Sequence, residues 1–295
     1  MFLPESVLIQ INFHSKFVIR SIFCRFVRRA QGGMGFTHGL MGLVCEAFFW
    51  VVWMRDYNMV VNRIEALAGQ EVRLEQLGEV NHLPIFCVTV SQNKSLPTLY
   101  INGGTHGDEP AGVEGALAFL ESDWAQWLDR LQFQVIPCLN PWGYVYDTRE
   151  NAQGVDINWA CLKKGVPEIA IIKKFIQNKK FVATVDLHED WESPGYYVYE
   201  LYRDFAIGQR ITRRVAGVCQ LNTGRVIEGE NATHGVIHPN LEADKRRVDD
   251  GIPIVLFRYG YTNRLVTTET PTKEPLAKRI DAQLATLDVV IGAHT

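Results

Sequence analysis

Across most of the chain, short apolar runs alternate with segments whose apolar residues recur at helical spacing. Two β-rich runs, 71–80 and 84–91, predict an opening hairpin or edge pair. A short apolar strand is predicted at 97–102. The segment 110–121 is predicted to be a helix, because it opens on a proline whose missing N–H would be unpaired in the first turn anyway.

The same alternation continues to the end of the chain. Further strands are predicted at 133–139, 181–187, 196–201, 252–258 and 265–269, and helices at 167–178, 203–221 and 274–291. Segment 145–165 shows no clear period and indicates a long ordered loop, a kind that is usually functional in a compact domain. The stretch 222–250 is polar and rich in glycine. The whole pattern predicts an α/β fold with a mostly parallel or mixed sheet and helices on both faces.

Residues 1–58 differ from the rest. The run Leu40–Met54 is apolar except for Glu46, which makes it shorter than the roughly 18–20 residues of a spanning helix and charged near its middle. Four interpretations are open: a poor membrane anchor, an atypical signal, an added helix, or an extension outside the working domain. The extension is favoured, since Met59 offers a later start. We therefore expect an N-terminal extension at 1–58 and a catalytic domain at 59–295; an insoluble or inactive product on truncation at Met59 would contradict this division.

The composition is that of a globular enzyme. With 295 residues, 47% hydrophobic, the chain can bury a large core, and its formal net charge of -3 gives no reason to expect a nucleic-acid partner. The six cysteines are widely spaced and include no C-x-x-C pair, which favours reduced thiols. A cytoplasmic location without membrane attachment is the expectation. The oligomeric state is left open by the sequence.

A candidate metal site begins at Thr105–Gly112, between a predicted strand and a predicted helix. At such a turn, His106 and Glu109 can face the same side at about 5–6 Å, although a His near a Glu is more often a surface pair. His188, at the end of a buried strand, is a plausible third ligand, or alternatively a core histidine bonded to backbone. Two imidazoles and one carboxylate with an open fourth position describe a catalytic zinc site. Asp186 is either an outer partner of a ligand or a strand cap.

Two further patches offer groups for hydrolysis. Arg149 beside a metal could hold a developing oxyanion, and Asn158 could orient a polar group of the substrate; the alternative is a turn-rich loop that serves only its own backbone. Glu269 could take a proton from water and pass it to a leaving nitrogen. Because His106, His188 and Glu269 each follow or end a strand, we expect them to gather at one edge of the sheet.

Together the four patches resemble the zinc carboxypeptidase family (peptidase family M14), including the succinylglutamate desuccinylases and aspartoacylases. The resemblance rests on H-x-x-E at His106, R-x-N-x-x-G-V-D-I-N from Arg149, D-L-H at Asp186–His188 and T-x-E-T-P at Thr267–Pro271. It implies a three-layer α/β/α domain around a mixed, mostly parallel sheet of about eight strands. It also implies one zinc per chain held by His106, Glu109 and His188, an oxyanion-binding Arg149, and Glu269 as general base and acid.

The chain departs from this family after Asn158, which matches the substrate-binding Asn. The next residue is Trp159 where the family usually has an Arg that grips a substrate carboxylate, and an indole N–H cannot replace that charged fork. Trp159 could instead stack on an apolar or sugar-like portion of the substrate. The other candidates to supply the charge are Arg203, Arg246, Arg247, Arg258 and Arg264. The candidates for a tyrosine over the substrate are Tyr259 and Tyr261.

The predicted function is therefore a zinc metallocarboxypeptidase-like hydrolase of a small peptide. Two alternatives stay open: a deacylase of N-acyl amino acids, and a non-catalytic binding protein on the same fold. A second metal at His234 and His238 is disfavoured, since Gly235 and Pro239 indicate a loop, and a substrate-lining role is favoured over it. The remaining clustered aromatic residues are interpreted as core or helix-face residues: Trp124, Trp127, Tyr196, Tyr197 and Tyr199.

Overall fold

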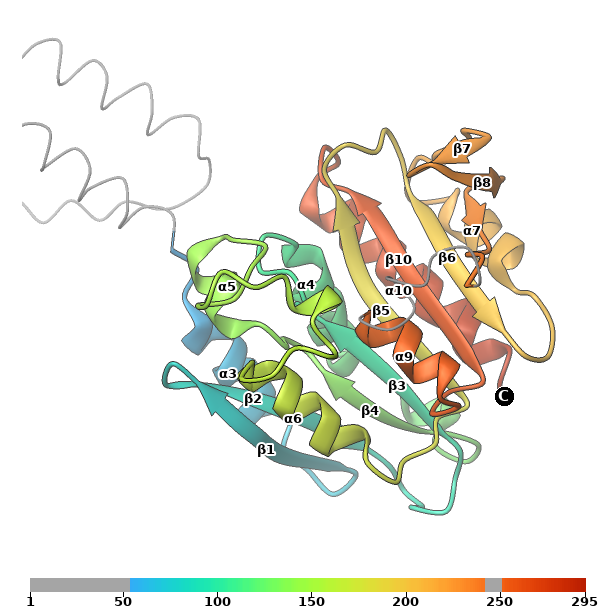
Figure 1. Cartoon of the computed structure of the whole chain (residues 1–295). Coiled ribbons are helices and arrows are strands. Elements are labelled where there is room, and N and C mark those ends of the chain that lie inside the picture. Colours follow the sequence, from blue (N-terminus) through green and yellow to red (C-terminus); the bar gives the residue numbers. More distant parts are fainter. Residues whose placement is uncertain (1–53, 242–250) are drawn as a thin grey trace, which may run out of the picture. The chain divides into compact units, whose positions relative to one another are not determined.

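The computed structural model describes residues 54–241 and 251–295 (Figure 1). The predicted extension up to residue 53 lies outside this range, as do Arg246 and Arg247. The division between residues 58 and 59 stays a prediction. Tyr57, however, is buried in the main hydrophobic core, and its hydroxyl donates to the Pro84 carbonyl at 2.8 Å. The residues just before Met59 therefore contribute to the packing of the domain.

One sheet of ten strands runs through the described part of the chain, in the order β1-β2-β4-β3-β5-β10-β6-β9-β8-β7. The strands are β1 (Val72–Val80), β2 (Leu83–Val90), β3 (Thr98–Gly103), β4 (Gln132–Ile136), β5 (Ala183–Asp190), β6 (Tyr197–Tyr202), β7 (Val226–Ile227), β8 (Glu230–Thr233), β9 (Val236–Ile237) and β10 (Arg264–Pro271). Parallel pairing is continuous from β4 through β3 and β5 to β10, whereas β2 and β6 join this centre antiparallel. The sheet is mixed, as predicted.

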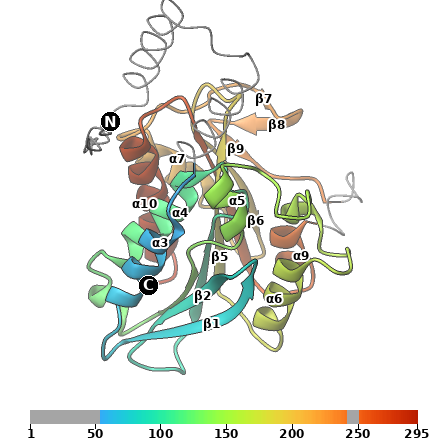
Figure 2. The ribbon, with the colours of Figure 1, turned by 90° about the vertical axis from the view of Figure 1, so that its left-hand side faces the viewer.

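Helices cover both faces of the sheet, which confirms the three-layer α/β/α prediction (Figure 2). The helices are α3 (Tyr57–Ala66), α4 (Pro110–Leu120), α5 (Pro141–Tyr146), α6 (Pro167–Ile176), α7 (Gly208–Val215), α9 (Ile252–Arg258) and α10 (Leu276–Gly292), with short 3-10 turns η1 (Ala125–Trp127) and η2 (Ile157–Trp159). On one face α3, α4, α7 and α10 bury the larger core; on the other, α6 and α9 bury a second one. The central strands are therefore apolar on both sides.

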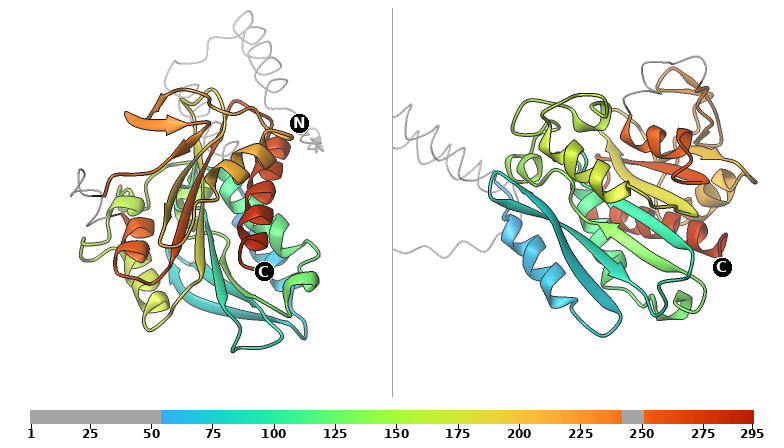
Figure 3. Two further views of the ribbon diagram at one scale, coloured as in Figure 1. Left: turned by 90° about the vertical axis from the view of Figure 1, so that its right-hand side faces the viewer. Right: turned by 60° about the horizontal axis from the view of Figure 1, so that its bottom comes forward.

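The opening hairpin is confirmed. Strands β1 and β2 pair antiparallel across Asn81 and His82, whose φ angles are 51° and 65°. Two consecutive positive φ values are typical of the tight turn whose twist matches that of the strands. The hairpin lies at the edge of the sheet beside α3 (Figure 3).

One local prediction was wrong. The segment 252–258, expected to be a strand, is helix α9, whose Pro253 lies in the first turn. A proline suits that position but cannot donate to a central strand, and so short an apolar run carries no decisive period. The polar stretch 222–250 contains the short strands β7, β8 and β9, which bring the sheet to ten strands instead of about eight.

No helix within 54–241 or 251–295 combines the length and apolarity required to cross a bilayer.

A buried ion pair joins β6 to β10. Arg264 and Glu200 are both fully buried, and Arg264 Nη1 lies 2.7 Å from Glu200 Oε1. We expect Arg264→Ala to lower the free energy of unfolding by about 3–5 kcal/mol, because it leaves a buried carboxylate without its counter-ion. Arg214→Ala is the matched control, since its pair with Asp288 is about half exposed and is expected to contribute under about 1 kcal/mol. Urea unfolding measures both, and equal losses would contradict the expectation.

Candidate metal centre

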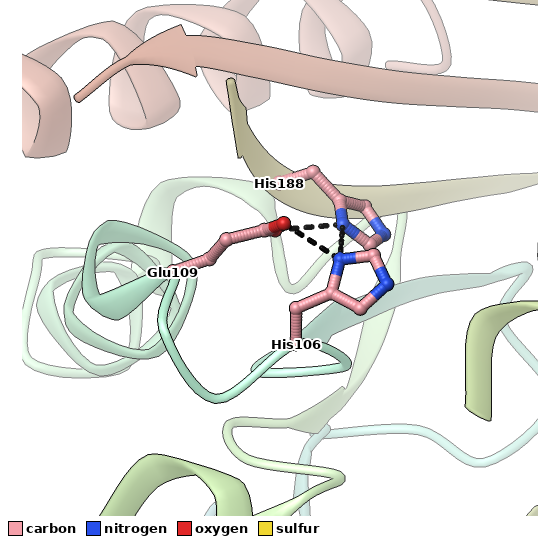
Figure 4. Close-up of side chains that lie close together, drawn as sticks. All are labelled: His106, Glu109 and His188. Carbon is pink, nitrogen blue, oxygen red and sulfur yellow. Dashed lines mark hydrogen bonds and ion pairs between the residues drawn. The ribbon is translucent and has the colours of Figure 1, made fainter. Parts of the chain in front are cut away.

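His106, Glu109 and His188 come together at the carboxyl ends of two neighbouring parallel strands (Figure 4). His106 follows β3, Glu109 caps the start of α4, and His188 lies in β5, which pairs with β3. His106 Nδ1 is 2.6 Å and His188 Nδ1 is 2.8 Å from the Glu109 carboxylate, and the two Nδ1 atoms are 3.2 Å apart. In the described ranges, this is the one group of His, Cys, Asp and Glu residues whose ligand atoms converge in this way.

Each imidazole is held from behind by a carboxylate. His106 Nε2 lies 3.1 Å from Asp156 Oδ1, and His188 Nε2 lies 3.1 Å from Asp186 Oδ2. If each Nε2–H donates to its carboxylate, each Nδ1 presents a lone pair to the shared centre, as a metal-ligating histidine does. Asp186 is thus the carboxylate partner of a candidate ligand, which is one of the two roles that the sequence left open for it. Asp156 belongs to the motif that begins at Arg149, but no local pattern indicated this role.

The donor set suits zinc. Two nitrogens and one carboxylate, with the remaining side open to a cavity, match a catalytic zinc site, whereas a structural site is closed by a fourth protein ligand. The 3.2 Å between the two Nδ1 atoms is close to the roughly 3.3 Å that two zinc–nitrogen bonds at a tetrahedral angle produce. Burial opposes the charge on Glu109, yet the two imidazoles outweigh it and lower the pKa of that carboxyl. Glu109 is therefore held in the ionised form that a metal-binding carboxylate needs.

Gly107 lets the segment 106–109 pack directly on α5. This segment carries two candidate ligands and is called the metal-binding connection. A Cβ added at Gly107 would lie 1.8 Å from the backbone carbon of Gly143. No side chain fits in that space, so the connection between His106 and Glu109 is held against α5 backbone to backbone. This close packing fixes the backbone positions from which the His106 and Glu109 side chains project.

Arg149 and Glu269 lie beside the three ligands. Arg149 Nε donates to Asp156 Oδ2 at 2.9 Å, so one carboxylate orients both His106 and the guanidinium. Glu269 pairs in register with His188 across β10 and β5. Burial raises the pKa of Glu269 well above its ordinary range; His188 opposes this rise, and Glu109 adds to it.

A cavity of about 270 Å³ is lined by every predicted site residue. Its lining includes the three metal-ligand candidates together with Arg149, Asn158, Trp159 and Glu269. The structure therefore brings all of them to one place.

Part of the lining escaped sequence reasoning. Tyr197 and Tyr199, expected to be core residues, line the cavity, and Tyr197 also packs in a small buried cluster. Side chains alternate along a strand, so Tyr197, Tyr199 and Leu201 share one face of β6, and all three line the cavity. Trp191, 70% exposed just beyond β5, lines it too. The missed carboxylates of the lining are Glu189, Asp190, Glu192, Glu228 and Glu230.

The alternative arginines and tyrosines lie elsewhere. Arg264 is locked in its buried ion pair, and Arg203 donates to the Phe257 carbonyl and stacks on that ring. Arg203, Arg264 and Arg258 do not line the cavity. Arg149 is therefore the single Arg or Lys residue of its lining within the described ranges. Tyr259 and Tyr261 are likewise absent from the lining.

The two histidines of the hairpin loop do not form a second metal site. His234 lies at the turn between β8 and β9 with a φ of 52°. His238 contacts the Glu200 carbonyl and the Tyr202 ring. Neither histidine lines the cavity in the described part of the chain. The structure therefore does not support the substrate-lining role that the sequence favoured for them.

Part of the chain is similar in sequence to known carboxypeptidases. Residues 57–160 match the family model described as zinc carboxypeptidase. Carboxypeptidase SOL1 of Arabidopsis thaliana is 27% identical over 159 residues, which is 46% of this chain and 31% of that protein. The chain thus matches less than a third of the length of this curated relative.

Solved structures share the fold over most of the chain. A presumed metallopeptidase from Shewanella amazonensis superposes with a TM-score of 0.69 at 23% identity, covering 81% of this chain and 92% of that one. A metallo-carboxypeptidase from Burkholderia cenocepacia gives a TM-score of 0.62 at 15% identity, over 82% of this chain and 70% of that one. At these identities the likeness is one of fold.

Proposed function

Since the chain is a member of the zinc carboxypeptidase family (peptidase family M14), we propose that it is a zinc-dependent, carboxypeptidase-like hydrolase of amide bonds. One observation carries the proposal. His106, Glu109 and His188 converge on the wall of a cavity that Arg149 and Glu269 also line. A non-catalytic binding protein has no need for that combination.

The residues take the following roles in this proposal. Zinc held by His106, Glu109 and His188 would supply a Lewis acid that polarises the scissile carbonyl and activates water. Glu269 takes a proton from the attacking water and delivers it to the leaving nitrogen. A dication nearby favours the ionised carboxylate that this role needs, against the effect of burial. Arg149, oriented by Asp156, offers its N–H donors to the developing oxyanion.

Asn158 is proposed to orient the substrate. It lines the cavity at 8% exposure, and its Oδ1 accepts no hydrogen bond from the protein. Buried acceptors are nearly always paired, so a donor on the substrate is the partner that fits. Trp159, the next residue along the chain, lines the same cavity and is proposed to pack on an apolar portion of the substrate.

The cavity favours a peptide over an acyl amino acid with two carboxylates. Leu201, Ile254 and Leu265 give it an apolar part. Among the described lining residues, the carboxylates of Asp190, Glu192, Glu228 and Glu230 outnumber the single guanidinium, which works against a dianionic substrate. The deacylase of N-acyl amino acids stays the second candidate because the metal chemistry is the same.

A matched set of substrates separates the candidates. The zinc-loaded chain is incubated with N-blocked dipeptides ending in leucine and with N-acetyl and N-succinyl amino acids, and the released amino acid is quantified. We expect kcat/KM to be at least about tenfold higher for the dipeptides. A reversed ratio would make the chain a deacylase. Turnover of neither class would leave the binding-protein alternative. Each dipeptide is also tested as its C-terminal amide, to show whether a free carboxylate matters beside Trp159.

A further inference from the structure

We propose that Arg55, which precedes α3, is a positioning residue for the metal centre. Arg55 would hold the metal-binding connection, which carries His106 and Glu109, against α5. Arg55 lies before the region matched by the family model, and no motif of the sequence includes it. The inference rests on the proposed function in one respect, namely that these ligands bind a metal.

The guanidinium of Arg55 bridges two segments that touch each other. Its Nη1 donates to the Gly107 carbonyl at 2.7 Å and to the Tyr144 carbonyl at 3.0 Å. Its Nη2 pairs with the carboxylate of Asp147, which ends α5 in the left-handed conformation. The guanidinium carbon also lies 5.1 Å from the centre of the Tyr144 ring. Four contacts thus fix this one group between the metal-binding connection and α5.

These contacts meet where the metal-binding connection is tightest. Gly107 lies between His106 and Glu109 and packs on the backbone of Gly143 and Tyr144. Arg55 bonds a carbonyl on each side of that backbone contact. A shift of the Gly107 peptide would carry the His106 backbone with it. Metal affinity depends on ligands being held in place before the ion arrives. A planar guanidinium that bonds both carbonyls through Nη1 and Asp147 through Nη2 therefore favours binding.

Arg63 offers a matched comparison within the same part of the chain. Its guanidinium pairs with Glu114 at 2.6 Å and with Glu121 at 2.7 Å, and thereby ties α3 to α4 and the residue after it. The side chains of Arg55 and Arg63 are comparably exposed, at 23% and 32%. Within the described residues, the hydrogen bonds of Arg63 go to Glu114 and Glu121, and none goes to the segment 105–109. Replacing it removes a similar arginine from the same layer without touching the metal-binding connection.

The test is the zinc affinity of the full-length chain, measured by competition with a chromophoric chelator in the absence of substrate. We expect Arg55→Ala to weaken zinc binding by about tenfold or more, as loss of a group behind a ligand does, and Arg63→Ala to stay within about twofold of the parent. Arg55→Lys keeps the charge but offers one nitrogen in place of two, so it cannot bond both carbonyls and Asp147 from the same planar group, and an intermediate loss is expected. The cobalt-substituted proteins give a second readout: a changed visible spectrum for Arg55→Ala alone.

The proposal is overturned if Arg55→Ala binds zinc within twofold of the parent, or if Arg63→Ala weakens it equally. If Arg55→Ala does not fold, Arg55→Lys decides, and zinc affinity equal to that of the parent overturns the proposal. Since no step requires turnover, the two claims fail separately. A chain that binds zinc through an Arg55-dependent site but hydrolyses no amide contradicts the proposed function and not this inference. A parent chain that binds no zinc contradicts both.

Discussion

The substitution Glu269→Gln is expected to lower kcat by about 10²–10⁴-fold while zinc remains bound at one ion per chain. Glutamine keeps the size of the side chain and its place in β10 opposite His188, but it cannot accept a proton from water. Glu269 is not among the converging ligands, so the metal should be unaffected. Single-turnover hydrolysis and metal analysis of the same sample measure the two quantities.

Glu274→Gln is the matched control for this experiment. Glu274 follows β10, pairs with Lys278 near the surface and does not line the cavity. Its replacement should leave both turnover and zinc content unchanged. Activity retained in Glu269→Gln would refute the assignment of Glu269 as the base, and loss of zinc would mean that Glu269 helps to bind it.

The substitution His188→Ala is expected to remove stoichiometric zinc and with it all hydrolysis above background. His188 Nδ1 lies 2.8 Å from Glu109 and its Nε2 lies 3.1 Å from Asp186. Its loss takes away one candidate ligand, leaves Asp186 without its imidazole partner and leaves Glu109 with His106 alone. Zinc content after dialysis against a buffered trace of zinc gives the readout, together with hydrolysis of the preferred substrate.

His238→Ala serves as its control, because His238 is exposed, contacts the Glu200 carbonyl and the Tyr202 ring, and does not line the cavity. That variant should bind zinc as the parent does. Stoichiometric zinc in His188→Ala would show that His106 and Glu109 hold the ion without the third ligand, contrary to the account.

The three candidate metal ligands could be identified from the sequence because their signals are local. His106 and Glu109 are three residues apart at a strand-to-helix turn, and His188 and Glu269 each sit in a strand that is apolar in sequence. The rule that functional residues gather beyond the carboxyl ends of parallel strands then brings them together. The parallel pairing of β3, β5 and β10 confirms that step.

What the sequence could not predict depends on contacts between distant residues. The contact of Asp156 with His106 spans 50 residues, and that of Arg264 with Glu200 spans 64, and neither leaves a trace in local spacing. The same is true of Arg55 and Gly107. Helix α9 shows a different limit, since a short apolar run fits a buried strand and a buried helix equally well.

The cavity lining illustrates a third limit. Tyr197 and Tyr199 alternate along β6 and could equally have faced a core, because period two shows which residues share a face but not what covers it. Only the position of β6 beside β10 shows that this face borders the metal centre. The substrate is therefore the part of the account that the sequence constrains least.

The most direct test is a titration of the chelator-treated chain with zinc, in which bound zinc and amide hydrolysis are measured in the same samples. The account predicts no hydrolysis at zero zinc and a linear rise to a plateau at one zinc per chain. Full activity without zinc, or one bound zinc per chain without hydrolysis of any peptide or acyl amino acid, would contradict it.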